Sequence, residues 1–255
     1  MTAVRVETEA GVMTVTLADV ANRNALGADL LQGLYAAISA ANDAPEIRAV
    51  VVTNEGSTFC AGANLKERSG KTRGAATEIG FEEVLHAIQT SPTPIIGRIA
   101  GHVVGGGNGL ASALDISIAA DNVKFGFTEV RLGVAPAIIS VVCLPKMRRG
   151  EALEAFLRGN RFPASKAAEL GLINRAVPAD ELDGAIEEVL ADLRKGGPKA
   201  LGFAKRLVYE VPPMDPKEAF QWTSHLSAKL FSSDEAKEGM AAFLGKRKAH
   251  WASDE

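Results

Sequence analysis

The 255-residue chain has little of several features that mark particular protein classes. It contains two cysteines, Cys60 and Cys143, too few for the disulfide framework of a small secreted protein. Its four histidines are scattered without ligand spacing, so we expect no metal site. The formal net charge is only −3 and the charges are interspersed, which argues against a nucleic-acid partner. A hydrophobic share of 47% remains, enough for a sizeable globular core.

Long apolar runs are also missing. No window of the sequence approaches the roughly 18 consecutive apolar residues of a membrane span. The first residues alternate between polar and apolar types and do not follow the charged-then-apolar layout of a signal peptide. We therefore expect a cytoplasmic protein without a membrane partner.

What the chain does contain is an alternation of strand and helix patterns, followed by a helical tail. Apolar residues recur at helical spacing over 27–43, and a short apolar run at 47–55 predicts a buried strand. The other expected strands and strand-like runs are 4–8, 12–17, 94–104, 116–121, 124–130 and 172–178. The other expected helices are 81–91, 110–115, 149–159, 165–170, 180–195, 198–209 and 215–245. The pattern predicts an α/β protein of one domain, with a core over 1–195 and a helical region over 196–255.

Two stretches of small residues each follow a predicted strand, namely FCAGANLKE (59–67) and GGGNG (105–109), and both are expected to be loops. A helix is expected to begin near Asn108. Bare backbone N–H groups at such turns favour developing negative charge and would form an oxyanion hole if two of them converged. Glycine also permits tight strand-to-helix packing, so the loops alone leave both interpretations open. The sequence has no phosphate-binding GxxxxGK[ST], and residues 105–110 do not fit GxGxxG because position 110 is leucine.

Five motifs occur together and in order: FCAGANLKE, IAGHVVGGGNGL (99–110), FGFTEVRLGV (125–134), ASKAAELGLINRAV (164–177) and EGMAAFLGKRK (238–248). Together they resemble the enoyl-CoA hydratase/isomerase, or crotonase, superfamily, and the resemblance runs from about residue 3 to residue 251. It implies a spiral of ββα turns with a helical C-terminal trimerisation region. It also implies an acyl-CoA thioester substrate, with CoA as part of that substrate and no separate cofactor, and a homotrimer or a dimer of trimers.

The resemblance assigns roles to individual residues. The backbone N–H groups of Ala63 and Gly106 match the oxyanion hole, and Glu129 matches a catalytic acid/base. Glu129 could otherwise belong to a surface ion pair, for instance with Arg131. The residues that match the CoA-binding positions are Ala61, Ala63, Asn64, Leu65, Lys66 and Gly106, with Phe243 and Lys246 reaching the adenine end from a neighbouring subunit. Arg23 matches a position at which the N-terminal segment of family members passes the CoA phosphates. A solvated arginine fits the sequence equally well.

The chain departs from the family pattern at the position of a first catalytic glutamate, where it has Gly109. A second departure is APAIISVVCLPKM (135–147), which replaces a glycine-rich segment. The use of asparagine at position 64 in place of the usual aspartate is expected to be neutral for the chemistry. Three functions stay open: an enoyl-CoA hydratase that relies on Glu129, which the sequence favours; a Δ3,Δ2-enoyl-CoA isomerase in which Glu129 shuttles a proton; and a non-catalytic acyl-CoA-binding module.

Overall fold

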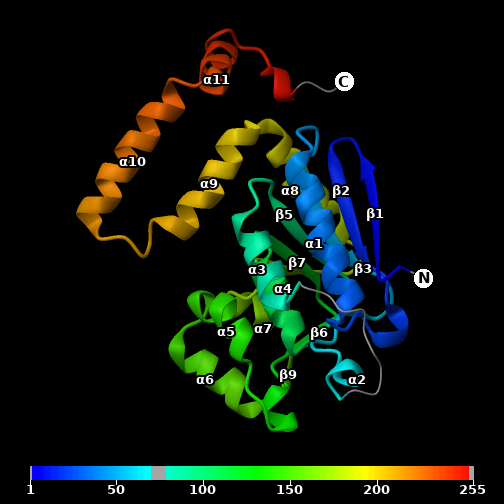
Figure 1. The fold of residues 1–255 in the computed structure, drawn as a ribbon. Helices are drawn as coiled ribbons and strands as arrows, with labels where there is room; N and C mark the ends of the chain where they lie inside the picture. The colour runs from blue at the N-terminus through cyan, green and yellow to red at the C-terminus, as the bar shows by residue number, and fades with distance from the viewer. Residues whose placement is uncertain (1, 70–78, 253–255) are drawn as a thin grey trace.

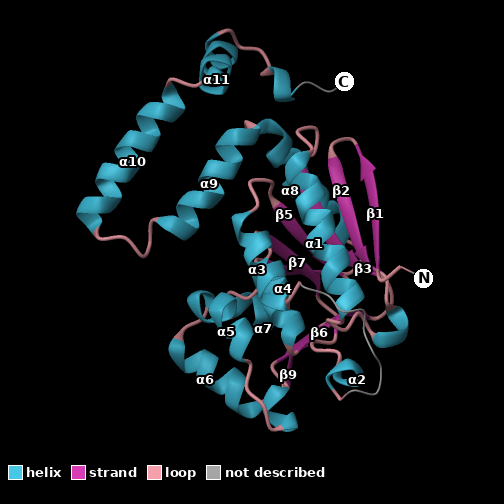
Figure 2. Cartoon of the chain, viewed as in Figure 1, coloured by secondary structure: helices cyan, strands magenta, loops and turns pink. Residues whose placement is uncertain are grey.

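The computed structural model describes residues 2–69 and 79–252. Strands gather on one side of the core, helices surround them, and a frame of helices stands apart from the sheets (Figures 1 and 2). No helix in the described residues is long and apolar enough to cross a membrane.

The larger sheet has the strand order β1-β2-β3-β5-β7-β10. Its strands are β1 (Val4–Glu9), β2 (Val12–Leu17), β3 (Ala49–Asn54), β5 (Ile95–Ile99), β7 (Ile116–Ala120) and β10 (Arg175–Val177). β1 and β2 form an antiparallel hairpin around Ala10 and Gly11, and the other pairs are parallel. Every residue of β3 is buried, as expected for a continuous apolar run in a parallel sheet covered on both faces.

A smaller sheet has the order β4-β6-β8-β9. Its strands are β4 (Thr58–Cys60), β6 (His102–Val104), β8 (Lys124–Gly126) and β9 (Arg161–Pro163). Along the chain β3 leads to β4, β5 to β6 and β7 to β8, so three successive passes through the larger sheet continue into the smaller one. The expected strand-like run 94–104 is therefore two strands in two sheets. This repeated strand–strand–helix path confirms the α/β spiral of ββα turns.

Helices cover the sheets. α1 (Ala28–Asp43) packs on β1 and β2, and it also contacts α3 (Phe81–Thr90). The apolar stripe read from the sequence is buried in α1, where Leu30, Leu34 and Ile38 are at most 1% exposed. α8 (Leu182–Lys195) packs on β5 and β7.

The remaining helices are α5 (Ala137–Cys143), α6 (Arg149–Arg158), α7 (Ala164–Glu169), α9 (Pro198–Glu210), α10 (Pro216–Phe231) and α11 (Asp234–Leu244), besides α2 and α4 of the site below. The single helix expected over 215–245 is wrong, because α10 ends at Phe231 and a new helix follows. Ser233 begins that helix, its hydroxyl accepting a hydrogen bond from the Ala236 N–H at 3.1 Å. Serine is a favoured cap because it satisfies an N–H that has no partner within the helix.

The frame of α9, α10 and α11 is attached to the core at both ends (Figure 1). Within its first helix, Lys205 of α9 forms an ion pair of 2.8 Å with Asp115, and both side chains are largely buried. The Arg48 guanidinium joins the two ends of the frame, donating to the backbone carbonyls of Gly196 (2.7 Å), just before α9, and of Trp251 (2.9 Å), after α11. The Trp251 indole N–H in turn donates to the Lys195 carbonyl at 3.2 Å.

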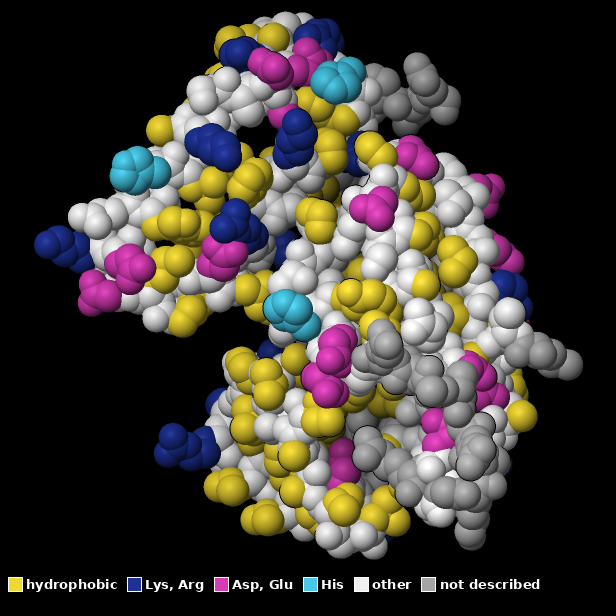
Figure 3. Space-filling view, in the orientation of Figure 1, with side chains coloured by type: hydrophobic (Ala, Val, Ile, Leu, Met, Phe, Trp, Pro, Cys, Tyr) yellow, Lys and Arg dark blue, Asp and Glu magenta, His cyan; other side chains and the backbone are white. Residues whose placement is uncertain are grey.

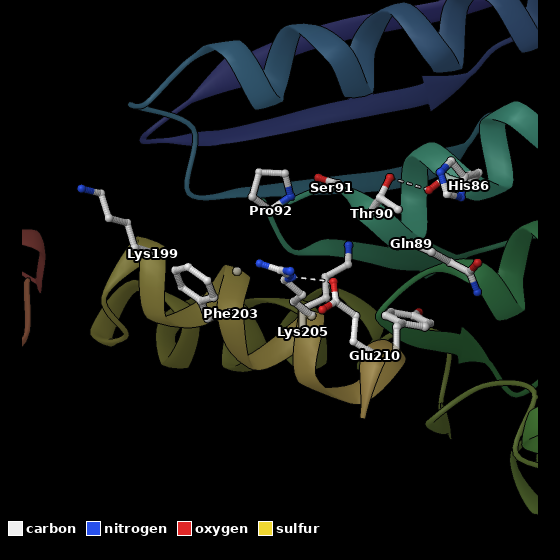
Figure 4. A pocket seen from close by; sticks show the side chains of 12 residues that line it. His86, Gln89, Thr90, Ser91, Pro92, Lys199, Phe203, Lys205 and Glu210 are labelled. Atoms are coloured by element: carbon white, nitrogen blue, oxygen red, sulfur yellow. Dashed lines mark hydrogen bonds and ion pairs between the residues drawn. The ribbon is translucent and has the colours of Figure 1, made fainter. Parts of the chain in front are cut away.

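A cavity of about 530 Å³ lies where the frame meets the core. Figure 4 shows it between α3 and α9, with His86, Gln89 and Thr90 on one side and Lys199, Phe203 and Lys205 on the other. None of the residues assigned to the acyl-CoA site lines this cavity.

Candidate active site

The glycine-rich stretch forms the start of a helix. Gly105 has a positive φ of 55°, which favours glycine, and its N–H donates to the Gly126 carbonyl at 2.9 Å. α4 (Gly106–Ala113) begins at the next residue. The expected loop over 105–109 is therefore wrong, because residues 106–109 belong to α4, and the helix begins two residues before the start expected near Asn108. The buried Asn108 side chain ties the turn together, donating to the carbonyls of Gly105 (3.0 Å) and Gly126 (2.9 Å).

The second small-residue stretch lies directly against the first. The expectation of a loop throughout is wrong here, because the stretch contains the end of β4 and the short helix α2 (Leu65–Arg68). Between these, Gly62 has a φ of 82°. A Cβ on Gly62 would lie 2.9 Å from both the Gly106 nitrogen and the Val104 carbonyl oxygen, so only glycine allows this approach.

Two backbone N–H groups are left unpaired where these segments meet. Ala63 follows Gly62, and Gly106 is the first residue of α4, where helix N–H groups have no partner within the helix. Both residues are half-buried. Within the described residues neither N–H donates to a protein acceptor. The positive end of the α4 dipole adds to this local preference for negative charge.

Glu129 lies beside the same turn. The strand expected over 124–130 ends at Gly126, and Glu129 begins a 3₁₀ turn, η2 (Glu129–Leu132). Its Oε1 atom would be 3.6 Å from a Cβ on Gly105. Its Oε2 atom is buried and has no hydrogen-bond partner among the described residues, so the side chain is not held in a surface ion pair. Burial raises the pKa of Glu129, and a hydrogen bond to its own backbone opposes that rise.

Gly109 lies one helical turn beyond Gly106 and is buried. A Cβ at this position would overlap Cγ2 of Ile139 and lie 2.7 Å from Cβ of Ile139. Ile139 belongs to α5, which packs against α4 and which the sequence patterns did not predict. The position that would hold a first carboxylate is therefore filled by an isoleucine from a neighbouring helix.

The residues assigned to CoA fall into two groups. The first group comes together around α2: the Ala61 N–H donates to the Arg23 carbonyl (3.2 Å), and Lys66 Nζ donates to Asn22 Oδ1 (3.0 Å). Lys66 is exposed, and Leu65 is 55% exposed. The second group is Phe243, which lies on α11, and Lys246 just after it. α11 lies at the opposite end of the molecule from α2, so the single chain does not bring the two groups together (Figure 1).

The chain is similar to known enzymes along nearly its whole length. Residues 7–254 match the family model for enoyl-CoA hydratase/isomerase. The chain is 32% identical to an enoyl-CoA hydratase of Mycobacterium tuberculosis, covering 95% of this chain and 93% of that protein. It is 31% identical to a crotonyl-CoA hydratase of Syntrophomonas wolfei, covering 90% of each.

Solved structures show the same fold. The crystal structure of an enoyl-CoA hydratase from Mycobacterium smegmatis superposes with a TM-score of 0.88 at 28% identity, covering 98% of this chain and 99% of that one. Pseudomonas aeruginosa AtuE superposes with a TM-score of 0.90 at 29% identity, covering 98% of this chain and all of that one. The chain therefore belongs to the enoyl-CoA hydratase/isomerase family of enzymes, within the crotonase superfamily.

Proposed function

We propose that the protein is an enoyl-CoA hydratase that adds water across the double bond of an α,β-unsaturated acyl-CoA. The observation that carries this proposal is the half-buried Glu129, whose Oε2 has no partner among the described residues, beside the Ala63 and Gly106 N–H groups, which have no protein acceptor there either. A carboxylate whose pKa is raised by burial is suited to taking up and returning a proton.

In this mechanism the Glu129 carboxylate takes a proton from water while the water oxygen bonds to C3 of the substrate. The C2–C3 π electrons move into the thioester, and an enolate oxygen forms. The Ala63 and Gly106 N–H groups donate hydrogen bonds to that oxygen, which stabilises the charge where it develops. Glu129 then returns the proton to C2, so the 3-hydroxyacyl-CoA contains all atoms of the water.

A second candidate is a Δ3,Δ2-enoyl-CoA isomerase, and the packing of Ile139 on Gly109 is the observation that favours it. A site with one carboxylate can move a proton between C4 and C2 through the same enolate, and this reaction needs no bound water. Hydration needs Glu129 and main-chain groups to hold the water without a second carboxylate.

The two reactions are distinguished by incubation with 2-enoyl-CoA and 3-enoyl-CoA in H₂¹⁸O, followed by mass detection. A ¹⁸O-labelled 3-hydroxyacyl-CoA made directly from the 2-enoyl substrate supports the hydratase. A shifted double bond without label supports the isomerase. The absence of any reaction across a panel of chain lengths would support the non-catalytic acyl-CoA-binding module.

The Glu129→Ala variant tests whether Glu129 is the group that transfers the proton. General acid–base catalysis contributes about 10²–10⁴-fold, so turnover should fall by about a hundredfold or more while CoA still binds. CoA binding is measured by calorimetry on the same preparation.

We also propose that the enzyme works as a homotrimer or a dimer of trimers. Phe243 is 83% exposed on α11, far from α2 in its own chain, and it is free to contact CoA in a neighbouring copy together with Lys246.

A further inference from the structure

The N-terminus of α1 lacks a cap from its own segment. Its N-cap residue is Gly27, which has no side chain to accept a hydrogen bond from the first turn. Glu67, from the distant helix α2, supplies the missing acceptor, because its Oε2 accepts a hydrogen bond from the Ala28 N–H at 3.2 Å. A Cβ at position 27 would overlap Glu67 Oε1, so the glycine makes room for the borrowed carboxylate.

The other oxygen of Glu67 reaches back to the oxyanion segment. Asn64 Nδ2 donates to Glu67 Oε1 at 2.7 Å. The Asn64 carbonyl oxygen, Oδ1, accepts from the backbone N–H groups of Lys66 (3.2 Å) and Glu67 (3.4 Å), which caps α2. The Asn64 side chain thus has a donor and an acceptor role, and only the acceptor role is open to an ionised aspartate.

Ala63 is held from its other side by the same stretch of chain. The Leu26 N–H donates to the Gly62 carbonyl at 2.7 Å, and Leu26 pairs with Ala63 in a short parallel bridge. The peptide group between Gly62 and Ala63 carries this N–H and is connected to residues 26–28 in two ways. Its carbonyl, from Gly62, is hydrogen-bonded directly to Leu26. The residue after Ala63, Asn64, is connected to Ala28 through Glu67.

We propose that Glu67 is a positioning residue, which acts through Asn64 to hold the Ala63 N–H in the direction that the enolate oxygen needs. This inference rests on the proposed function, because it assumes that Ala63 is an oxyanion donor. It also replaces the expectation that the Asn64 side chain is neutral for the chemistry. A small displacement of a donor weakens the stabilisation of the transition state more than it weakens substrate binding.

The first test is Glu67→Ala, measured with a 2-enoyl-CoA under saturating and subsaturating conditions. We expect kcat to fall about tenfold, less than the loss of a whole donor, with KM changed much less. A merely structural cap would lower the melting temperature and leave kcat of the folded enzyme unchanged.

The chain provides a matched control in Glu235. Its carboxylate caps α9 in the same way, accepting from the N–H groups of Lys199 (3.1 Å) and Ala200 (2.8 Å). The N-cap of α9, Gly197, likewise has no side chain, and a Cβ there would overlap Glu235 Oε1. Glu235→Ala should lower the melting temperature by a similar amount and leave kcat unchanged, with the oligomeric state confirmed for both variants.

The second test reverses the hydrogen bond. Asn64→Asp removes the donor and places two carboxylates face to face, so kcat should fall several-fold. In the double variant Asn64→Asp/Glu67→Gln, the amide nitrogen introduced at position 67 can donate to the carboxylate introduced at position 64, while the amide oxygen accepts from the Ala28 N–H. We expect this double variant to recover most of the lost kcat, an outcome that a general loss of stability does not produce.

Hydrogen exchange of the peptides over 24–31 and 59–67 reports on the same network without turnover. Faster exchange in Glu67→Ala, and slower exchange in the double variant than in Asn64→Asp, are the expected results. If the wild type turns over enoyl-CoA and Glu67→Ala keeps its kcat, the inference is wrong and the proposed function stands. If the wild type is inert, the proposed function fails, and unchanged exchange in both peptides would show that the network is absent as well.

Discussion

Among single residues, Glu129 combines partial burial with an oxygen atom that has no partner among the described residues. Desolvation disfavours the charged carboxylate and raises its pKa, and the opposing influence is a hydrogen bond within the residue itself. Such a group holds a proton at a pH where an exposed glutamate has lost it.

This raised pKa predicts two pH dependences. For hydration, the acid limb of kcat/KM should have its midpoint above about 4.3, the ordinary glutamate value, because Glu129 must be ionised to act as the base. In the window between about 4.3 and the raised pKa, the folded state binds more protons than the unfolded chain, so stability falls as pH rises. Glu129→Gln should remove that slope in urea unfolding and abolish turnover. An acid limb centred at or below the ordinary value would refute the assignment.

The contact between Gly109 and Ile139 predicts a coupled response to mutation. Gly109→Ala places a methyl group inside the Ile139 side chain, so it should lower the free energy of unfolding by about 1–3 kcal/mol. In an Ile139→Ala background the same change should cost less, because part of the overlap is relieved. Urea unfolding of all four proteins in a double-mutant cycle measures the coupling. Additive effects would show that the two side chains do not compete for one space.

The sequence supplied the identity of these residues but not their surroundings. The family register alone identifies Gly109 as the position of a missing carboxylate. The isoleucine that fills its place comes from a helix further along the chain that no pattern indicated. Contacts between distant segments depend on tertiary packing, which residue types in one window do not encode.

At the scale of elements, the start of α4 is the feature that the chemistry needs. Its first N–H has no acceptor in the part of the chain that the structure describes, because Gly106 begins the helix, and Gly62 keeps the space in front of it open.

A comparison of Gly106→Pro with Gly106→Ala measures the contribution of that N–H to kcat. Both variants add a Cβ that would meet the Leu26 side chain at 2.9 Å, and proline suits the first position of a helix, but only proline deletes the donor. We expect Gly106→Pro to lose about 10²–10³-fold more kcat than Gly106→Ala. Steady-state kinetics on both folded variants makes the comparison, and equal activities would remove the oxyanion role from Gly106.

Elements with a clear hydrophobic pattern along the sequence were predictable, and short elements were not. The amphipathic stripe of α1 and the apolar run of β3 are long enough to be recognised within one or two residues of their ends. α5 has the sequence AIISVVC, which is seven residues long and rich in the β-branched residues that favour strands. α4 begins with glycines, which are poor helix formers, and it forms because Asn108 and the neighbouring strands fix its first turn.

For the whole molecule, the frame of α9 to α11 carries exposed apolar side chains. Phe220 on α10 is 73% exposed, and Phe243 and Leu244 on α11 are 83% and 80% exposed. Hydrophobic side chains also gather over α5 and α6 at the lower left of Figure 3, where Leu153 and Leu157 are exposed. Apolar surface of this extent is typical of a protein that associates.

A chain ending before residue 235 tests this association. It lacks nearly all of α11 and the exposed Phe243 and Leu244, so it should no longer form the trimer expected of the full chain. Sedimentation velocity of the two proteins at equal concentration gives the masses, and circular dichroism shows whether the ββα core of the shortened chain is folded. A stable trimer of the folded, shortened chain would contradict the role given to this region.

The two attachments of the frame restrict how copies of the chain can come together. Because Arg48 binds the chain at both ends of the frame and Lys205 holds α9 between them, the frame is a closed loop of helices and not a free arm. Exchange of its helices between copies would have to break the bonds from Arg48 to Trp251 and Gly196 first. We therefore expect each chain to fold before it associates, so that the rate of the proposed assembly depends on protein concentration and not on refolding.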